Sequence, residues 1–209
     1  MPVDKTNRSS RVPQQARGNE RKERILDACA AIISEAGVTG LTMQGLSKRA
    51  STAIGSLYHF FPTKESVIDG LKYRHAKAFD NKMQTILSIS NEQWINCTTE
   101  KVMAMFIFPL MEFLENHPEN LALIAYDFHK KGAFEPKNFD QIQVLYRHIL
   151  KLRSPQTDDS TCDMHSLILF SLPIGLIEVA NLKPKYRKQI LLHYIPRVLS
   201  NYLTSIENS

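Results

Sequence analysis

Apolar side chains recur with the period of an α-helix from about residue 19 to the end of the chain. Ile25, Cys29 and Ile32, for example, follow one another at intervals of four and three residues, which places them on one face of a helix. No stretch alternates apolar and polar residues as a half-buried strand does. The sequence therefore predicts an all-α protein with about nine helices.

Capping residues divide the N-terminal region into one long helix and two short ones. Asn19 is positioned to cap the long helix, and Gly37 to end it in a left-handed backbone conformation. Thr42 can cap a short helix over residues 42–49, and a second short helix is expected over residues 53–60. The two residues between the short helices leave room only for a tight turn.

After the two short helices, prolines indicate where helices begin, end or bend. Pro62 interrupts the pattern, and Thr63 can cap a long helix that runs from residue 64 to about residue 88. Further prolines lie inside apolar helical stretches, where each is expected to kink its helix or to mark a break. They are Pro109, Pro173 and Pro196.

The excess positive charge lies entirely in the first two-fifths of the chain. The whole sequence has 26 Lys and Arg residues against 21 Asp and Glu residues, a net charge of +5. Residues 1–80 contain 13 basic and 8 acidic side chains, whereas the remainder contains 13 of each. Such asymmetry is expected either of a solvated basic face or of a region that binds a polyanion, namely nucleic acid or an anionic membrane surface.

Cysteine content and hydropathy indicate a cytoplasmic protein. The three cysteines are odd in number and widely spaced, which fits neither a disulfide framework nor paired metal ligands. No run approaches the roughly 18 consecutive apolar residues of a membrane-spanning helix. The N-terminus also lacks the apolar core of a signal peptide. We therefore expect neither secretion nor a membrane partner.

Three helices in the basic region have the lengths and spacing of a helix-turn-helix motif. In such a motif one helix crosses the DNA backbone and, after a tight turn, a short recognition helix enters the major groove. Thr42 would offer its hydroxyl and the unpaired N–H groups of a helix N-terminus to a phosphate. Small residues of the recognition helix, namely Thr52, Gly55 and Ser56, can approach base edges. The residues that follow, namely Tyr58, His59 and Lys64, can contact phosphates. The alternative is a three-helix bundle whose short helices only pack together.

Two stretches of this region match the pattern of a known family. The sequence LTMQGLSKRA at residues 41–50 is followed by GSLYHFFPTKE at residues 55–65. With RILDAC upstream at residues 24–29, they resemble the tetracycline-repressor (TetR) family of bacterial regulators. The resemblance implies a DNA-binding domain over residues 19–79, with its helix-turn-helix at 42–61, and an effector-binding and dimerisation domain over residues 80–209.

The resemblance also implies that the protein binds operator DNA as a homodimer. It places the Thr42 hydroxyl on a phosphate, directs residues 52–55 toward the groove, and gives Tyr58, His59 and Lys64 contacts with the DNA backbone. The full set of expected DNA-contacting residues is Thr42, Met43, Thr52, Ala53, Ile54, Gly55, Ser56, Tyr58, His59 and Lys64.

The chain departs from the family pattern at the turn. Family members usually have Gly-Val-Ser where this chain has Ser51-Thr52-Ala53. Ile54 stands where a polar or basic residue is common, so it either contacts thymine methyl groups or packs internally. Phe60 replaces a His or Tyr that could donate to phosphate.

Residues 1–18 precede the helical pattern and differ from it in composition. They are poor in large apolar side chains and contain Arg8, Arg11 and Arg17 among Ser, Gln and Pro residues. Such a segment buries too little surface to offset the entropy lost on ordering, so a disordered basic arm is expected. The arm either enters a minor groove or remains a solvated tail.

The C-terminal two-thirds is less specific. Its flexible and aromatic side chains at helical spacing are expected either in a plain core or, as the resemblance implies, around an apolar effector cavity. The expected cavity residues are Phe106, Met111, Tyr126, His129, Phe170, Pro173 and Ile177. The last two helices, near residues 162–181 and 184–206, either belong to the core or pair with their copies across a dimer interface. The expected interface residues are Ile174, Ile177, Leu191, Ile195, Val198 and Tyr202.

The sequence predicts no enzyme, no cofactor and no metal site. Its histidines form no H-x-x-x-H pair, and it has no G-x-S-x-G motif and no phosphate-binding glycine-rich loop. The predicted function is a homodimeric, ligand-responsive transcriptional regulator, expected to be a repressor, with double-stranded operator DNA and a small-molecule effector as partners. Two alternatives remain: a DNA-binding dimer controlled by a protein partner or by its abundance, and an architectural nucleic-acid binder.

Overall fold

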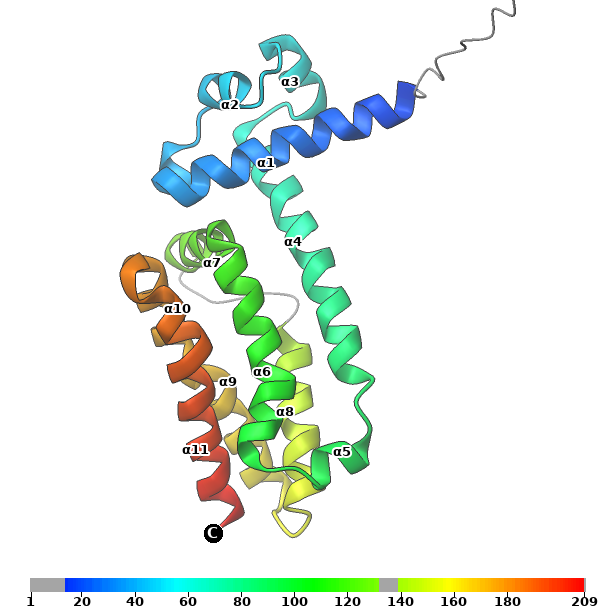
Figure 1. Cartoon of the computed structure of the whole chain (residues 1–209), viewed down its shortest axis with the longest axis vertical. Helices are drawn as coiled ribbons and strands as arrows, with labels where there is room; N and C mark the ends of the chain where they lie inside the picture. Colours follow the sequence, from blue (N-terminus) through cyan, green and yellow to red (C-terminus); the bar gives the residue numbers. More distant parts are fainter. Residues whose placement is uncertain (1–13, 132–138, 209) are drawn as a thin grey trace, which may run out of the picture. The chain divides into compact units, whose positions relative to one another are not determined.

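The computed structural model describes residues 14–131 and 139–208, in which it contains helices and no strand (Figure 1). The all-α prediction is therefore confirmed. With the continuous helical stretch from Arg187 to Glu207 counted once, the described residues form ten helices rather than about nine. The chain divides into two compact units, residues 1–71 and 72–209.

The first unit contains three helices and the beginning of a fourth. They are α1 (Gln14–Gly40), α2 (Met43–Arg49), α3 (Ile54–Phe60) and the start of α4 (Lys64–Leu87). Because α1 begins at Gln14, Asn19 is not its cap and residues 14–18 are helical rather than part of an arm. Residues 1–13, with Arg8 and Arg11, lie outside the described residues.

Large aliphatic side chains of all four helices form the core of the first unit. Leu26 and Ile33 of α1, Leu46 of α2 and Leu57 of α3 are almost completely buried. Gly37 has a φ of 68°, as expected for a left-handed end to the main part of α1. Gly70 of α4 is needed for close packing, because a Cβ atom there would lie 2.9 Å from the Phe61 ring.

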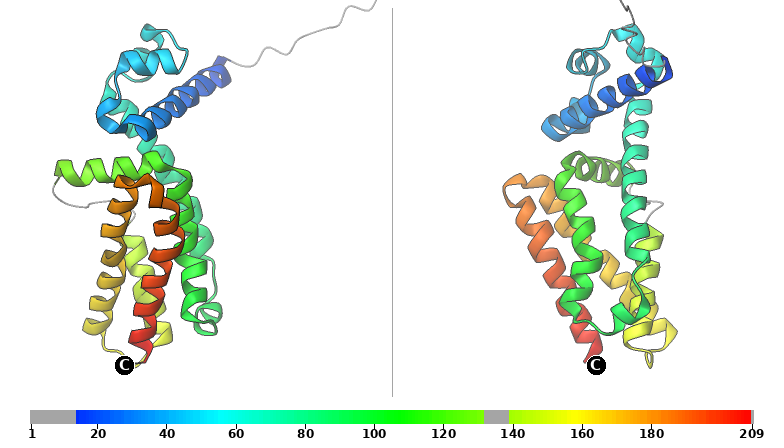
Figure 2. Two further views of the ribbon diagram at one scale, coloured as in Figure 1. Left: turned by 60° about the vertical axis from the view of Figure 1, so that its left-hand side comes forward. Right: turned by 45° about the vertical axis from the view of Figure 1, so that its right-hand side comes forward.

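The second unit contains the rest of α4 and the remaining helices. They are α5 (Asn91–Ile95), α6 (Thr99–Asn116), α7 (Pro118–Lys131), α8 (Phe139–Arg153), α9 (Asp159–Leu182), α10 (Arg187–Gln189) and α11 (Ile195–Glu207). Helix α6 packs against α11, and α8 packs against α9. Helix α7 runs across one end of these long helices (Figure 2).

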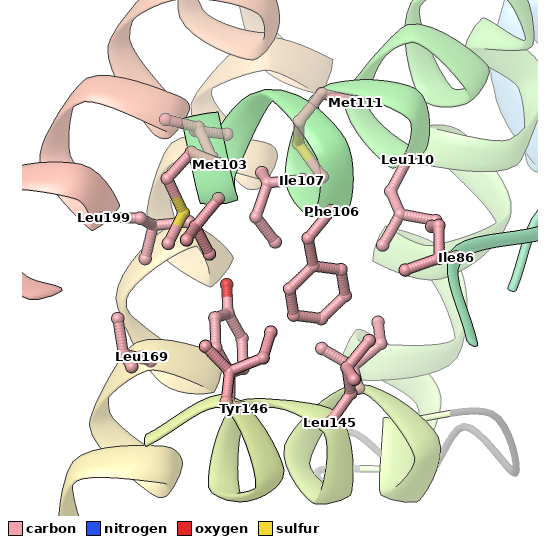
Figure 3. Packing of buried hydrophobic residues seen from close by; sticks show 14 of the residues in the cluster. Ile86, Met103, Phe106, Ile107, Leu110, Met111, Leu145, Tyr146, Leu169 and Leu199 are labelled. Carbon is pink, nitrogen blue, oxygen red and sulfur yellow. The ribbon is translucent and has the colours of Figure 1, made fainter. Parts of the chain in front are cut away.

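Helix α6 supplies the centre of the hydrophobic core in this unit (Figure 3). Its Met103 and Phe106 are at most 1% exposed, and they face Leu145 and Tyr146 of α8 and Leu199 of α11. The Phe106 and Tyr146 rings are 4.8 Å apart between centroids. Many of the Met and aromatic side chains singled out in the sequence are thus core residues.

The prolines inside apolar stretches do not end their helices. Helix α6 continues through Pro109 and α9 continues through Pro173. Pro196 lies in the first turn of α11, directly after a π-helical segment at Ile190–Tyr194. Of the three prolines, therefore, only Pro196 lies next to a segment that is not α-helical, and that π-helical segment precedes it.

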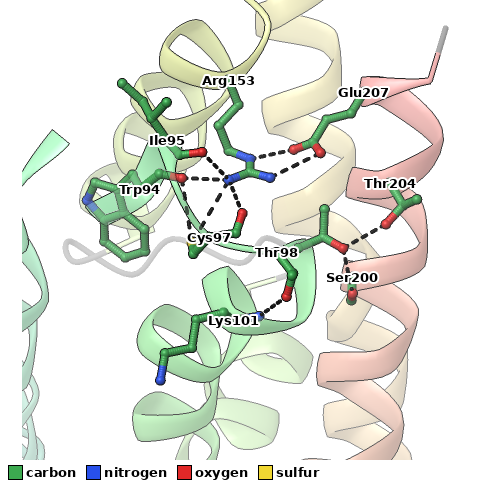
Figure 4. Close-up of polar contacts among 10 residues, drawn as sticks. Trp94, Ile95, Cys97, Thr98, Lys101, Arg153, Ser200, Thr204 and Glu207 are labelled. Atoms are coloured by element: carbon green, nitrogen blue, oxygen red, sulfur yellow. Dashed lines mark hydrogen bonds and ion pairs between the residues drawn. The ribbon is translucent and has the colours of Figure 1, made fainter. Parts of the chain in front are cut away.

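Arg153 joins three segments at one end of the second unit (Figure 4). Its guanidinium donates to both carboxylate oxygens of Glu207 on α11 and to the carbonyl oxygens of Trp94, at 2.6 Å, and Cys97, at 2.7 Å. Its side chain is 8% exposed. Burial of this charge is therefore compensated by a charge-assisted partner and by two carbonyl groups that accept its hydrogen bonds.

Candidate DNA interface and ligand cavity

The N-terminus of α2 has the geometry of an anion-binding site. Thr42 has an extended backbone, with φ at −129°, and its hydroxyl accepts a hydrogen bond from the Gly45 N–H at 3.1 Å. The same hydroxyl can donate its own hydrogen to a phosphate. Gly45 leaves room for this cap, since a Cβ atom there would lie 2.9 Å from Thr42 Oγ1. Met43 is half-buried beside the cap.

The turn between α2 and α3 is fixed by local hydrogen bonds. The Thr52 N–H donates to the Ser47 carbonyl at 3.1 Å, and the Ser47 hydroxyl donates to the Thr52 carbonyl at 2.7 Å. Ser51 adopts a left-handed backbone with φ at 47°. Thr52 is only 9% exposed and its hydroxyl donates to the Ala50 carbonyl at 3.2 Å. The expectation that Thr52 faces the groove is therefore wrong, because the turn buries its side chain.

Helix α3 buries one residue and exposes most of the others. Leu57 is fully buried, whereas Ile54 is 42% and Tyr58 48% exposed. Of the two interpretations of Ile54, the structure excludes internal packing. Ala53, Gly55 and His59 are exposed, Ser56 and Lys64 are half-buried, and the Ser56 hydroxyl accepts a hydrogen bond from Arg21 at 3.2 Å. A Cβ atom at Gly55 would meet nothing within 4 Å, so packing within the protein does not require this glycine.

A cavity of about 380 Å³ lies within the second unit. Its walls are mainly apolar and come from α4, α6, α7, α8, α9 and α11. They include Phe79, Met111, Ile124, Ile142, Phe170 and Ile177. Cavities of this size and polarity are typical of small-molecule sites.

Few polar groups reach the cavity, and they differ in how well they are satisfied. The Lys72 ammonium donates to both Asp127 oxygens at 2.6 Å, so its charge is already paired. The Tyr146 hydroxyl is buried and has no hydrogen-bond partner among the described residues. Burial also raises the pKa of Tyr146 far above its ordinary value, so the hydroxyl remains a neutral donor.

His75 extends from α4 to the cavity wall and contacts a buried carboxylate on α7. Its Nε2 atom lies 3.2 Å from Glu119 Oε1, and His117 Nδ1 lies at the same distance from that oxygen. Burial favours the neutral form of Glu119 and would raise the pKa of its carboxyl. The contacts with His75 and His117 and a backbone hydrogen bond favour the anion, and the net effect is a lowered pKa. Glu119 is therefore an anion in a largely apolar environment.

Comparison with known proteins identifies the first unit. Residues 25–71 match the model for bacterial regulatory proteins of the tetR family. The HTH-type transcriptional repressor KstR of Mycolicibacterium smegmatis is 38% identical over 63 residues, which cover 30% of this chain and 31% of that repressor. Residues 25–71 therefore form a DNA-binding domain of the tetR type. The match to KstR spans less than a third of either protein.

Solved structures of similar fold cover both units of the chain. A TetR-like transcriptional regulator from Rhodococcus sp. RHA1 has a TM-score of 0.61 at 14% identity, over 94% of this chain and 96% of that one. The complex of SmeT with triclosan has a TM-score of 0.57 at 15% identity, over 89% of this chain and 90% of that one. At these identities the likeness concerns the fold.

The cavity includes four of the seven residues expected there. Met111, Phe170, Pro173 and Ile177 line it, whereas Phe106 and Tyr126 do not. Phe106 was misassigned because helical periodicity cannot distinguish a cavity wall from solid core. The side chain of His129 lies outside the described residues. Sequence reasoning missed the polar groups, which are Lys72, His75, Asn120 and Tyr146; no local motif marks them.

The residues expected at the dimer interface differ in how exposed they are within the protomer. Leu191 and Ile195 are at most 1% exposed within the protomer, so their assignment to a surface is wrong. They are buried against α6 and belong to the core of this unit. Ile174 and Ile177 line the cavity, and Tyr202 is half-buried with its hydroxyl 2.9 Å from His165 Nδ1. Val198 is exposed.

Helix α9 nevertheless presents an apolar surface. It is the one described helix whose length and hydropathy would suffice to cross a membrane, yet only 17% of its most apolar window is buried. The exposed apolar residues on α9 are Met164, Leu167, Leu172, Val179 and Leu182. A surface of this kind on a helix of a folded domain is typical of a contact with another protein.

Proposed function

We propose that this protein is a transcriptional regulator that binds a near-palindromic operator as a homodimer and responds to an apolar small molecule. The TetR-type helix-turn-helix with an exposed recognition helix is the observation that carries this proposal. It acts on chromosomal DNA and therefore works in the cytoplasm. The relatives named as repressors favour repression as its output.

The DNA contacts follow from the exposed groups of α2, α3 and the start of α4. Thr42 and the N-terminus of α2 bind a phosphate, Met43 adds apolar contact beside it, and Tyr58, His59 and Lys64 contact the backbone. Ala53, Ile54, Gly55 and Ser56 face the major groove, where Ile54 contacts thymine methyl groups. Thr52 shapes the turn without touching DNA.

Dimerisation positions two recognition helices for consecutive major grooves. The exposed apolar face of α9, extended by Val198 of α11, is the surface we assign to the partner copy. A two-fold axis through this face would make the operator a near-palindrome whose half-sites lie about one helical turn apart or a multiple of it.

The cavity favours control by a small molecule over control by a protein partner or by abundance. Its ligand has an apolar body of moderate size and a hydrogen-bond acceptor for the Tyr146 hydroxyl. SmeT, whose fold is similar, forms a complex with triclosan. Helix α4 lines the cavity with Phe79 and begins at Lys64 in the DNA-binding unit, so a ligand that displaces Phe79 can shift the population of DNA-binding conformers.

The test begins with DNA. Selection from fragmented genomic DNA followed by footprinting is expected to give a protected near-palindrome of two half-sites. Uniform protection along the duplex would instead identify an architectural binder. Compounds that raise the melting temperature are then added to the operator complex, and release of DNA is the expected result. A ligand that binds without changing operator affinity would contradict the regulatory part of the proposal.

A further inference from the structure

The second unit brings two histidines and a glutamate together from three helices. His75 belongs to α4, His117 follows the end of α6, and Glu119 lies in the first turn of α7. Glu119 Oε1 is 3.2 Å from both His75 Nε2 and His117 Nδ1. All three ligand atoms lie within 4.8 Å of one another.

The His75 ring is the member of this cluster whose bonding is incomplete. Its side chain is 6% exposed, and Nε2 has no hydrogen-bond partner among the described residues. The nearby Glu119 oxygen does not meet the geometry of a hydrogen bond with it, despite the short distance. A buried ring nitrogen without a hydrogen-bond partner is costly, and a cation bound by both this nitrogen and the Glu119 carboxylate would satisfy it.

We propose that His75, His117 and Glu119 bind a divalent transition-metal ion of the Zn²⁺ type. Two imidazoles and one carboxylate are the protein ligands of many zinc sites that retain an open position. Zinc bonds of about 2.0–2.1 Å separate neighbouring ligand atoms of a tetrahedral site by roughly 3.4 Å, close to the two observed separations. Ca²⁺ and Mg²⁺ prefer all-oxygen ligands and are not expected here.

The surroundings of the cluster suit such an ion. The ring of Phe113 lies 6.0 Å from that of His75 and 4.7 Å from that of His117 between centroids, so it provides an apolar shell. The His117 side chain is 42% exposed, which gives ions a path from solvent and lets its ring rotate toward His75. Because His75 also lines the cavity, water or a ligand group at the fourth coordination position has access to it.

Metal binding would join α4 to the corner between α6 and α7. The Lys72–Asp127 ion pair already links the same part of α4 to α7. The ion would thus add a second, stronger link one turn further along α4.

Metal titration of the full-length protein tests the proposal. The protein is first freed of metal with a chelator, then titrated with Co²⁺ while visible absorption is followed, and finally with Zn²⁺. We expect one Co²⁺ per chain with the intense absorption of a four-coordinate site, its displacement by Zn²⁺, and a higher melting temperature. His117→Ala and Glu119→Gln should each weaken binding by more than the roughly 10- to 100-fold that loss of an outer-shell partner costs.

The control is His193→Ala, which removes an exposed histidine of the same unit. It should bind Co²⁺ as the unmodified protein does. Circular dichroism establishes that each variant is folded, and His117→Ala decides the outcome if Glu119→Gln is not. Absence of the Co²⁺ absorption, or equal affinity in His117→Ala and the unmodified protein, would overturn the site.

Discussion

Ser51 departs from the family pattern at a position where the backbone has a positive φ. The tight turn places Ser51 at a φ of 47°, a left-handed conformation that glycine adopts without strain. A left-handed conformation costs an L-residue about 1–2 kcal/mol because its Cβ approaches the following carbonyl. The hydrogen bonds of Ser47 and Thr52 hold the turn in place despite this cost.

Ser51→Gly is therefore expected to stabilise the protein by up to about 1 kcal/mol, because relief of the left-handed strain exceeds the extra chain entropy of glycine. The measurement is the urea midpoint of unfolding. Ser34→Gly, on an exposed position of α1, is the matched control and should lower stability by roughly 0.5 kcal/mol. Equal losses in both variants would contradict the strain assigned to Ser51.

Gly55 tests the DNA interface at the same scale. Gly55→Ala should leave the free protein as stable or slightly more stable, since a Cβ atom meets nothing within 4 Å. Operator affinity should fall about tenfold or more if the backbone of α3 approaches DNA at this position. Gly18→Ala has equally open surroundings on α1 and should leave affinity unchanged. Electrophoretic mobility shifts measure both, and unchanged affinity in Gly55→Ala would remove this residue from the interface.

At the scale of elements, the second unit depends on polar links between helix ends as well as on its apolar core. Arg153 at the end of α8 binds α11 through Glu207, α5 through the Trp94 carbonyl and the loop after α5 through the Cys97 carbonyl. Thr99 at the start of α6 shares hydrogen bonds with Thr204 and Ser200 of α11, at 2.7 Å and 3.2 Å. These contacts add directional links to helices that otherwise pack mainly through apolar side chains.

Arg153→Met should destabilise the protein by about 3–5 kcal/mol, because it leaves Glu207 and two carbonyl groups without their buried partner. Chemical denaturation measures the change. Arg197→Met removes an exposed arginine from α11 and should alter stability by less than about 0.5 kcal/mol. A loss of similar size in both variants would show that the Arg153 links contribute little.

At the scale of the whole molecule, the distribution of apolar surface separates the roles of the two units. The first unit exposes Ile54 and Tyr58 singly on α3, whereas the second exposes a row of apolar residues along α9. The balanced charge of the C-terminal two-thirds leaves this row without the repulsion that would oppose pairing of identical copies. The basic region, in contrast, has the charge that a DNA partner requires.

Leu167→Glu combined with Val198→Glu should dissociate the proposed dimer, since each copy would bury unpaired carboxylates in an apolar interface. A cost of about 3 kcal/mol or more weakens association at least roughly 100-fold. Sedimentation equilibrium measures the association, and operator affinity should fall with it. Tyr73→Glu changes a residue on α4 that is 73% exposed, and it should leave the dimer intact. A double variant that remains dimeric would place the interface elsewhere.

The sequence by itself determined the helical class, the helix-turn-helix and the family, because these depend on local properties. Apolar periodicity, the Thr42 cap and the spacing of Gly55, Tyr58 and Lys64 lie within short stretches and can be recognised without knowledge of the fold. The same local reasoning placed the caps correctly at Thr42 and Thr63. It failed at Asn19, because α1 continues through this residue and begins at Gln14.

Only the tertiary structure decided which apolar residues enclose a cavity, which are core and which remain exposed. Leu191 and Val198 are both apolar and lie about two helical turns apart, but Leu191 is fully buried against α6 whereas Val198 is 39% exposed. The cluster of His75, His117 and Glu119 likewise has no sequence signature. Its members are distant along the chain, and the packing of α4 against the junction of α6 and α7 is what brings their ligand atoms together.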